Sequence, residues 1–291
     1  MRRRWKKTMG TSKIRLVAVD MDGTLLNRER KITQYTQNVI RRAVSQGVVF
    51  APATGRAVNA LPQELKDMEE IRYGIFSNGA TIYDLKEKKV LYKNQFEQKR
   101  ILELMDFLKQ FDVMQSYSMN GQSYAARKDM ENVDYYQLDS NTKAIIHNSR
   151  KLINDLEDFL KEHDKTETVE STTVEKTTLL FKTMEERRRA ADALSKIEDI
   201  QFSSSLPKNI EISKKGCNKG DGLLHLAKSL GIKREEVMGC GDADNDRELL
   251  ECSGFSVAME NGIDEIKEIA DKIRNKVLQS LYFKKNMQYN R

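Results

Sequence analysis

The chain has 291 residues, enough for one large domain or two modest domains with a substantial hydrophobic core. Hydrophobic residues make up 39% and charged residues 32%, with 3 Pro and 15 Gly, which excludes collagen-like, low-complexity and broadly disordered chains. No apolar run approaches the roughly 20 residues of a membrane span, and no signal-peptide segment follows Met1–Lys7, so we expect a soluble cytoplasmic protein.

The net charge of +6 is concentrated at the two ends of the chain. Basic side chains fill residues 2–7 and recur through residues 272–291 without any acid, which leaves an acidic body between them. A nucleic-acid binder places its basic residues on a folded face, so this pattern makes nucleic-acid binding unlikely. Binding of nucleic acid or another anionic surface through these ends stays an alternative function. Salt-sensitive binding that disappears when the ends are deleted would support it.

Short apolar runs that end in polar residues predict a parallel sheet in the first and last parts of the chain. The predicted strands are Ile14–Val19, Val48–Ala53, Tyr73–Phe76, Glu236–Cys240 and Phe255–Met259. Between the first two, Thr33 can cap a helix that Gly47 stops, and later helices are predicted over Lys219–Leu230 and residues 245–252. Strands alternating with helices predict an α/β fold with a doubly wound, Rossmann-like parallel sheet.

About 125 residues interrupt this sheet, and their own pattern predicts a second domain. The predicted elements are a helix near residues 101–111, strands near 113–119 and 122–127, a helix over Ser149–His163, a strand over Thr177–Lys182, a helix over Met184–Ile197, and strands near 200–205 and 209–213. Alternation on this scale predicts an α/β domain inserted at residues 85–212. The first domain is then discontinuous, over residues 12–84 and 213–291.

The sharpest motif is Asp20-Met21-Asp22-Gly23-Thr24, directly after the first predicted strand. Such a run is also typical of an acidic turn that closes a strand. Two carboxylates at this spacing can, however, divide the work of phosphoryl transfer: Asp20 attacks phosphorus and Asp22 serves as the general acid and base. Gly23 lets the backbone turn tightly and approach the phosphate.

A carboxylate that attacks an anionic phosphate needs a hard cation, for which Mg²⁺ with oxygen ligands is suited. The run Gly241-Asp242-Ala243-Asp244-Asn245-Asp246 after a later strand supplies further acids. Asp242 is placed best as a direct ligand, whereas Asp246 and Asn245 can complete the outer shell. A calcium loop or an acidic helix cap is the alternative, although the glycine and glutamate of an EF-hand loop are missing.

Thr54 and Lys219 are candidates for holding the phosphoryl group. Thr54-Gly55 offers a hydroxyl and backbone amides at a predicted helix start, and Lys219 can neutralise both the phosphate and Asp20. Either feature alone also fits an ordinary helix entry or a solvated lysine. Arg56 either assists phosphate binding or is a surface arginine.

Taken in order, Asp-x-Asp-Gly-Thr, Thr-Gly-Arg, Asn-Gly, Lys-Gly and Gly-Asp-x-x-Asn-Asp resemble the haloacid dehalogenase superfamily over residues 13–270. The match is to its Cof-type sugar-phosphate phosphatases, which carry a large inserted cap. The resemblance implies that Asp20 is phosphorylated, that Asp22 is the acid and base, and that Thr54 and Lys219 hold the phosphoryl group. It implies Mg²⁺ binding by Asp20, the backbone carbonyl of Asp22 and Asp242, with Asp246 in support. Asn245 would lie near the phosphoryl oxygens, and Asn78 and Gly79 would face the substrate.

These inferences predict a Mg²⁺-dependent phosphatase that hydrolyses small phosphorylated metabolites, such as sugar phosphates, through an aspartyl-phosphate intermediate. A phosphotransferase or phosphomutase that uses the same aspartyl nucleophile is an alternative, because an alcohol can replace water as the acceptor. The motifs name neither the substrate nor the oligomeric state, since the inserted domain sets specificity.

Overall fold

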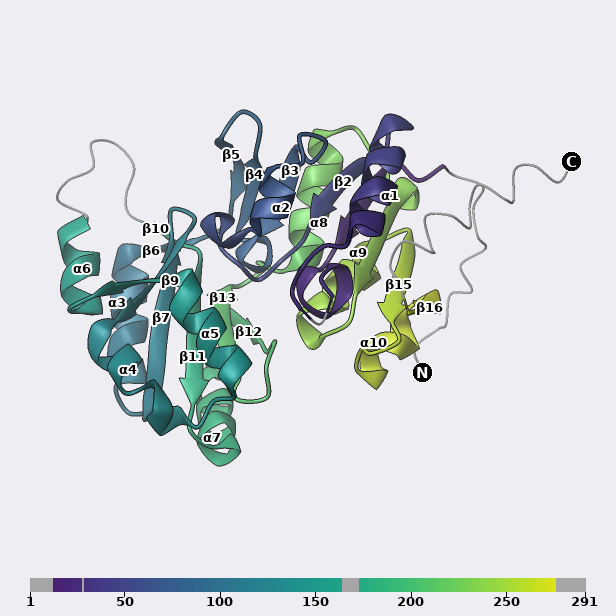
Figure 1. The fold of residues 1–291 in the computed structure, drawn as a ribbon. Helices are drawn as coiled ribbons and strands as arrows, with labels where there is room; N and C mark the ends of the chain where they lie inside the picture. Colours follow the sequence, from purple (N-terminus) through teal and green to yellow (C-terminus); the bar gives the residue numbers. More distant parts are fainter. Residues whose placement is uncertain (1–12, 28, 164–172, 276–291) are drawn as a thin grey trace, which may run out of the picture.

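The computed structural model describes residues 13–27, 29–163 and 173–275 (Figure 1). The basic N-terminal segment and residues 276–291 lie outside these ranges, and so does most of the predicted anionic-surface binding region. In Figure 1, elements from both ends of the chain form the right half of the molecule and the middle of the chain forms the left half. Within the described ranges, no helix combines the length and the apolar character needed to cross a membrane.

A five-stranded parallel sheet forms the first layer of the structure. Its strand order is β16 (Lys272–Arg274), β15 (Phe255–Met259), β14 (Val237–Gly241), β1 (Leu16–Val19) and β2 (Val49–Pro52). Every neighbouring pair in it is parallel, with Val19 opposite Cys240 on one side and Pro52 on the other. The carboxyl ends of β1 and β14 therefore lie side by side. One acidic motif directly follows each of these two strands.

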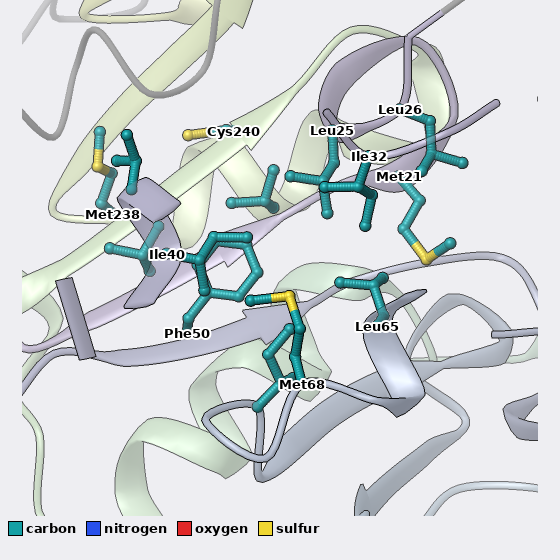
Figure 2. Packing of buried hydrophobic residues seen from close by; sticks show 14 of the residues in the cluster. Met21, Leu25, Leu26, Ile32, Ile40, Phe50, Leu65, Met68, Met238 and Cys240 are labelled. Atoms are coloured by element: carbon teal, nitrogen blue, oxygen red, sulfur yellow. The ribbon is translucent and has the colours of Figure 1, made fainter. Parts of the chain in front are cut away.

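Helices cover both faces of this sheet, as a doubly wound fold requires. They are α1 (Gln34–Ser45), α2 (Gln63–Lys66), α8 (Lys219–Ser229), α9 (Arg247–Cys252) and α10 (Asp264–Ile269). Because side chains alternate along a strand, Val17 and Val19 pack with α1 and α2 on one face, whereas Leu16 and Ala18 pack with α8, α9 and α10 on the other. Figure 2 shows the first of these clusters, to which Ile40 of α1, Leu65 of α2 and Phe50 of β2 belong.

An antiparallel sheet of three strands extends the parallel one. It contains β3 (Tyr73–Phe76), β4 (Thr81–Asp84) and β5 (Lys89–Lys93), and a parallel bridge between Ala53 and Ile75 joins it to the end of β2. Tyr92 of β5 stacks on His225 of α8, so β5 stays with the parallel sheet. We therefore propose that the inserted domain begins after Lys93 rather than at residue 85.

The inserted part is built on a six-stranded sheet. Its strand order is β12 (Ile200–Ser203), β13 (Asn209–Lys214), β11 (Lys176–Phe181), β7 (Val113–Met119), β8 (Gln122–Ala126) and β9 (Arg150–Ile153), and only the β8–β9 pair is parallel. A short pair of β6 (Phe96–Glu97) and β10 (Thr173–Val174) lies beside it. We call this part, from Phe96 to Lys214, the cap domain, and the rest of the described chain the core domain.

The helices of the cap domain divide between the two faces of its sheet. They are α3 (Gln98–Leu108), α4 (Arg127–Glu131), α5 (Ser140–Ser149), α6 (Leu156–His163) and α7 (Met184–Leu194). Leu179, Phe181 and Ile210 pack with α3, α6 and α7, whereas Leu180 on the opposite face packs with α4 and α5. The rest of that opposite face is polar and lines a cavity toward the core domain.

Two predicted local structures were wrong. The helix predicted over Ser149–His163 is a strand, β9, followed by α6, because β9 pairs along β8 and the Asp155 side chain accepts hydrogen bonds from Glu157 and Asp158 at the start of α6. The predicted helix start at Thr54 is a loop, and the residues after it form only two short turns, over Val58–Ala60 and over Gln63–Lys66. The backbone of this loop contacts the inserted domain, because the Gly55 carbonyl accepts a hydrogen bond from the Lys176 ammonium at 2.5 Å.

Candidate active site

Asp20 lies at the junction of β1 and β14. Its backbone N–H donates to the carbonyl of Cys240 at 2.9 Å, and its side chain is buried. The chain then turns tightly over Met21–Leu25, where Asp22 and Gly23 depart from helical geometry and Gly23 has φ of 89°. A Cβ at Gly23 would lie 2.2 Å from Oδ2 of Asp242, so this glycine lets the two acidic loops meet.

The acids that are distant in sequence converge around Lys219. Oxygen atoms of Asp20, Asp242 and Asp246 lie within 4.8 Å of one another. The ammonium of Lys219, the first residue of α8, donates to Asp20 Oδ1 and to Asp246 Oδ1, both at 2.6 Å. Since the Lys219 and Asp246 side chains are fully buried, these contacts form without competition from bulk water.

Burial and like charges shift the ionisation of this cluster. Burial raises the pKa of Asp20 well above its ordinary value, the neighbouring Asp246 adds to the rise, and Lys219 opposes it. Burial also raises the pKa of Asp242 to about 6, against a hydrogen bond from Thr24. Burial alone would lower the pKa of Lys219, but Asp20 and Asp246 outweigh it, so that this pKa is raised. The lysine therefore stays charged.

A divalent cation fits this donor set. Three carboxylates face one lysine ammonium, which leaves two negative charges that the side chains of the cluster do not neutralise. All the donors are oxygen atoms, the ligands that hard divalent cations prefer. Asp246 accepts from Lys219 and from the backbone N–H groups of Asp242 and Ala243, so its oxygens already have partners. Asp20 and Asp242 are the acids best placed to bind the cation directly.

Asp22 and Arg56 form a bidentate ion pair at the mouth of this cluster. Arg56 Nε and Nη2 donate to the two carboxylate oxygens of Asp22 at 2.9 Å and 2.6 Å. Thr54 is buried behind them, and its hydroxyl accepts from the backbone N–H of Arg56 at 3.1 Å. Asp20, Asp22, Thr54, Gly55 and Arg56 all line one cavity. The arginine therefore positions Asp22 instead of lying free on the surface.

Of the other predicted substrate-facing residues, Asn245 lines the cavity, whereas Asn78 lies behind Asn245 and is hydrogen-bonded to it. Asn78, with φ of 56°, donates to Oε2 of Glu211 at 2.5 Å and accepts from Asn245 at 3.2 Å. Asn245 lines the cavity, but Asn78 and Gly79 are not among its lining residues in the part of the chain described. A Cβ at Gly79 would lie 2.1 Å from the Asn218 carbonyl oxygen, so this glycine lets the start of α8 pack directly against the loop after β3.

The cavity has a volume of about 560 Å³, and the cap domain supplies much of its wall. Alternate residues of β11 and β13 point into it, among them Lys176, Thr178 and Glu211, and Arg150 lies at the start of β9. Sequence reasoning missed these residues. For Glu211 the sequence did contain an indication. This residue alternates with the apolar Ile210 and Ile212, which is typical of a strand with one polar face.

The family assignment rests on a match along most of the chain. A family model for haloacid dehalogenase-like hydrolases matches residues 17–279. The chain belongs to this family. The haloacid dehalogenase-like hydrolase described here is 27% identical over 274 residues to the phosphatase YwpJ of Bacillus subtilis, covering 89% of this chain and 94% of YwpJ. The Cof-type resemblance predicted from the motifs is confirmed.

Two further similarities support this assignment. The hydrolase is 26% identical over 264 residues to the 5-amino-6-(5-phospho-D-ribitylamino)uracil phosphatase YcsE of Bacillus subtilis, covering 89% of each chain. The solved structure of a haloacid dehalogenase-like hydrolase from B. subtilis matches it with a TM-score of 0.77 and 24% identity, covering 96% of this chain and 100% of the other. The shared fold confirms the predicted α/β class. The hydrolase is therefore a phosphoric monoester hydrolase.

Proposed function

We propose that this hydrolase is a Mg²⁺-dependent phosphatase that hydrolyses small phosphorylated metabolites through an aspartyl phosphate on Asp20. The observation that carries the proposal is the Asp20 carboxylate, which lines the cavity and is bound on one oxygen by Lys219. Because Lys219 occupies Oδ1, Oδ2 is the oxygen free to attack. A cavity of about 560 Å³ suits a small metabolite rather than a polymer.

In the first step, Oδ2 of Asp20 forms a bond to phosphorus and the bond from phosphorus to the ester oxygen breaks. Asp22 gives its proton to the departing alkoxide, which leaves as an alcohol. Thr54 and Lys219 supply a hydroxyl and a positive charge beside the transferred phosphoryl group. Since Arg56 binds both oxygens of the Asp22 carboxylate, one of these oxygens must leave the guanidinium and take up a proton from solvent before this step.

In the second step, water attacks the phosphorus of the aspartyl phosphate and Asp22 takes a proton from that water. The bond between phosphorus and Asp20 breaks, which releases inorganic phosphate and regenerates the carboxylate. The same group therefore serves first as acid and then as base, and Arg56 holds it at the cavity wall for both steps.

Asp20, Asp242 and the backbone carbonyl of Asp22 would hold the magnesium ion, with Asp246 supporting them through Lys219 and the backbone of Asp242. When bound, this ion supplies positive charge that lets an anionic phosphate approach an anionic nucleophile. The two unneutralised charges of the acid cluster support this proposal.

A sugar phosphate or a similar monoester is the proposed substrate class. YcsE is named for a substrate whose phosphate is carried by a ribityl chain, and this supports a polyhydroxylated carrier. Serine, threonine and asparagine side chains of the cap domain line the cavity, where they can bind hydroxyl groups; they include Ser123, Thr142, Asn148, Thr178 and Ser205.

Substitution of the nucleophile tests the proposal. Asp20→Asn keeps the side-chain volume but removes the attacking charge, so we expect phosphate release from aryl and sugar phosphates to fall on the order of a thousandfold or more. Asp244→Asn, in the exposed part of the second acidic loop, is the matched control. Mass spectrometry of acid-quenched wild-type enzyme should detect a phosphate on the Asp20 peptide during turnover.

An Asp20→Asn enzyme that hydrolyses at the wild-type rate would contradict the mechanism. Product analysis with added sugars separates hydrolysis from transfer, because phosphate that leaves the substrate only when an acceptor sugar is present would favour a phosphotransferase.

A further inference from the structure

Arg150 is a charged residue of the cap domain that the phosphatase mechanism does not use. It is the first residue of β9, at the edge of the six-stranded sheet, opposite Ser123 of β8. It is only partly buried, and it lines the same cavity as Asp20. A substrate in that cavity can therefore reach both residues.

Two serine hydroxyls fix the guanidinium in place. Nε donates to Oγ of Ser116 at 3.2 Å, and Nη1 donates to Oγ of Ser149 at 2.9 Å. A guanidinium has five N–H donors, so three have no hydrogen-bond partner among the described residues. No carboxylate of the described ranges lies within ion-pair distance of Arg150.

Glu211, the acid of the cap wall whose charge acts on Arg150, already has hydrogen-bond and ion-pair partners. Oε2 of Glu211 accepts from Asn78 at 2.5 Å and lies 3.1 Å from the Lys176 ammonium, while Oε1 accepts from Ser205 at 2.9 Å. Lys176 in turn donates to the Gly55 carbonyl. Glu211 thus neutralises Lys176, and the charge of Arg150 remains without a paired acid.

The guanidinium is charged at neutral pH in spite of its surroundings. Burial lowers the pKa of Arg150 to about 10, and Glu211 partly opposes this shift. Arg150 is partly withdrawn from water, and a cation that loses contact with water without gaining an anionic partner is destabilised. The cavity is the place from which the missing anion can come.

We propose that Arg150 binds a second anionic group of the substrate, a carboxylate or a second phosphate, remote from the phosphoryl group that Asp20 attacks. The inference rests on the proposed phosphatase function and narrows its substrate class. The free edge of the guanidinium matches the two oxygens of a carboxylate or phosphate. Held by Ser116 and Ser149, it is oriented before the substrate arrives.

Matched substrate pairs test the proposal. Phosphoglycerate is compared with glycerol phosphate, and a fructose bisphosphate with the corresponding monophosphate, as ratios of kcat/KM. Wild-type enzyme should have the higher kcat/KM for the compound with the second anion in at least one pair. A preference for phosphoglycerate would indicate that Arg150 binds a carboxylate, and a preference for the bisphosphate would indicate that it binds a phosphate. Arg150→Gln should reduce that ratio about 10- to 100-fold, the usual effect of losing hydrogen bonds to a charged group.

Lys151→Gln is the matched control, because it removes a positive charge from the next residue of β9, whose side chain is exposed. This variant should keep the wild-type ratio. Arg150→Lys, which retains the charge without the planar fork, should give an intermediate ratio even if Arg150→Gln folds poorly. Calorimetry of the same compounds on Asp20→Asn protein measures the preference in binding without turnover.

The possible failures are distinguishable. Wild-type enzyme that hydrolyses none of the phosphomonoesters would contradict the proposed function. Active enzyme with equal kcat/KM for both members of each pair, or a ratio unchanged by Arg150→Gln, would overturn the role of Arg150 and leave the phosphatase proposal intact.

Discussion

Position 23 needs a glycine for two reasons, its backbone conformation and the lack of space for a side chain. Its φ of 89° lies in the left-handed region, and the space that a side chain would fill holds the carboxylate of Asp242. The tight turn predicted from Asp-x-Asp-Gly-Thr is therefore also a close approach between β1 and β14, two strands separated by more than two hundred residues of sequence.

We expect Gly23→Ala to damage the site beyond its effect on stability. The new Cβ would lie 2.2 Å from Asp242 Oδ2 and displace this acid, so kcat should fall on the order of a hundredfold. Gly216→Ala is the control, because Gly216 also has positive φ, 75°, but an added Cβ would meet nothing within 4 Å. It should lose only about 1 kcal/mol of unfolding free energy, with activity kept. Equal loss of activity in both variants would show that backbone strain alone is responsible.

Single residues also show how far sequence could predict the site. Asp20, Asp242 and Lys219 were predictable because each follows or begins a recognisable element, and the parallel sheet brings those ends together. Glu211 was not, because its partner Asn78 depends on how the cap domain is placed over the core domain. Arg150 was not, because it lies on β9, which the sequence pattern assigned to a helix. The Asn78–Glu211 contact joins residues 133 apart in the chain, and no local pattern encodes it.

At the scale of elements, Glu175 connects the cap sheet to the loop after β3. It lies between β10 and β11, is buried, and accepts from the backbone N–H of Gly121 at 2.7 Å and from the Ser77 hydroxyl. Ser77, like Asn78, has positive φ, which a non-glycine residue adopts only when its surroundings hold it there. Two cap carboxylates, Glu175 and Glu211, hold these two residues.

The buried Glu175 carboxyl group predicts that the stability of the protein depends on pH. Burial raises the pKa of Glu175 above its ordinary value of 4.5, and the hydrogen bonds from Ser77 and Gly121 only partly oppose it. Above pH 4.5 the unfolded chain loses a proton that the folded chain keeps, so the unfolding free energy falls by about 1.4 kcal/mol per pH unit until the folded pKa is reached.

Glu175→Gln cannot lose that proton, so the variant should gain stability relative to wild type as pH rises above 4.5. Urea unfolding of both proteins at a series of pH values measures the difference. A difference that stays constant across the series would show that Glu175 titrates alike in the folded and unfolded chains.

Strands were predicted best where the apolar residues form an unbroken run. The strands of the parallel sheet are buried on both faces and read as continuous apolar runs, as in Leu16–Val19. By contrast, β9 is four residues long, lies at a sheet edge and is mostly exposed or intermediate, so its sequence did not differ from the start of a helix. Only its pairing with β8 makes it a strand.

At the scale of the whole molecule, metal removal should affect both activity and stability. A chelator should stop phosphate release and Mg²⁺ should restore it, because the ion neutralises the acid cluster of Asp20, Asp242 and Asp246. Mg²⁺ at a hundred times its Kd should add about 2.7 kcal/mol to the unfolding free energy, seen as a higher Tm. Asp242→Asn should reduce this shift, whereas Asp244→Asn should keep it. A Tm that does not respond to Mg²⁺ would argue against the site.

The two domains have separate hydrophobic interiors. Among the described residues, each apolar cluster draws its members from only one domain. The hydrogen bonds between the domains include Lys176 to Gly55, Asn78 to Glu211, Ser77 to Glu175, and the Asn59 backbone N–H to the Gly121 carbonyl. Because each apolar interior is complete within its own domain, a change in the angle between the domains would break polar contacts that water can replace, and it would leave both interiors packed.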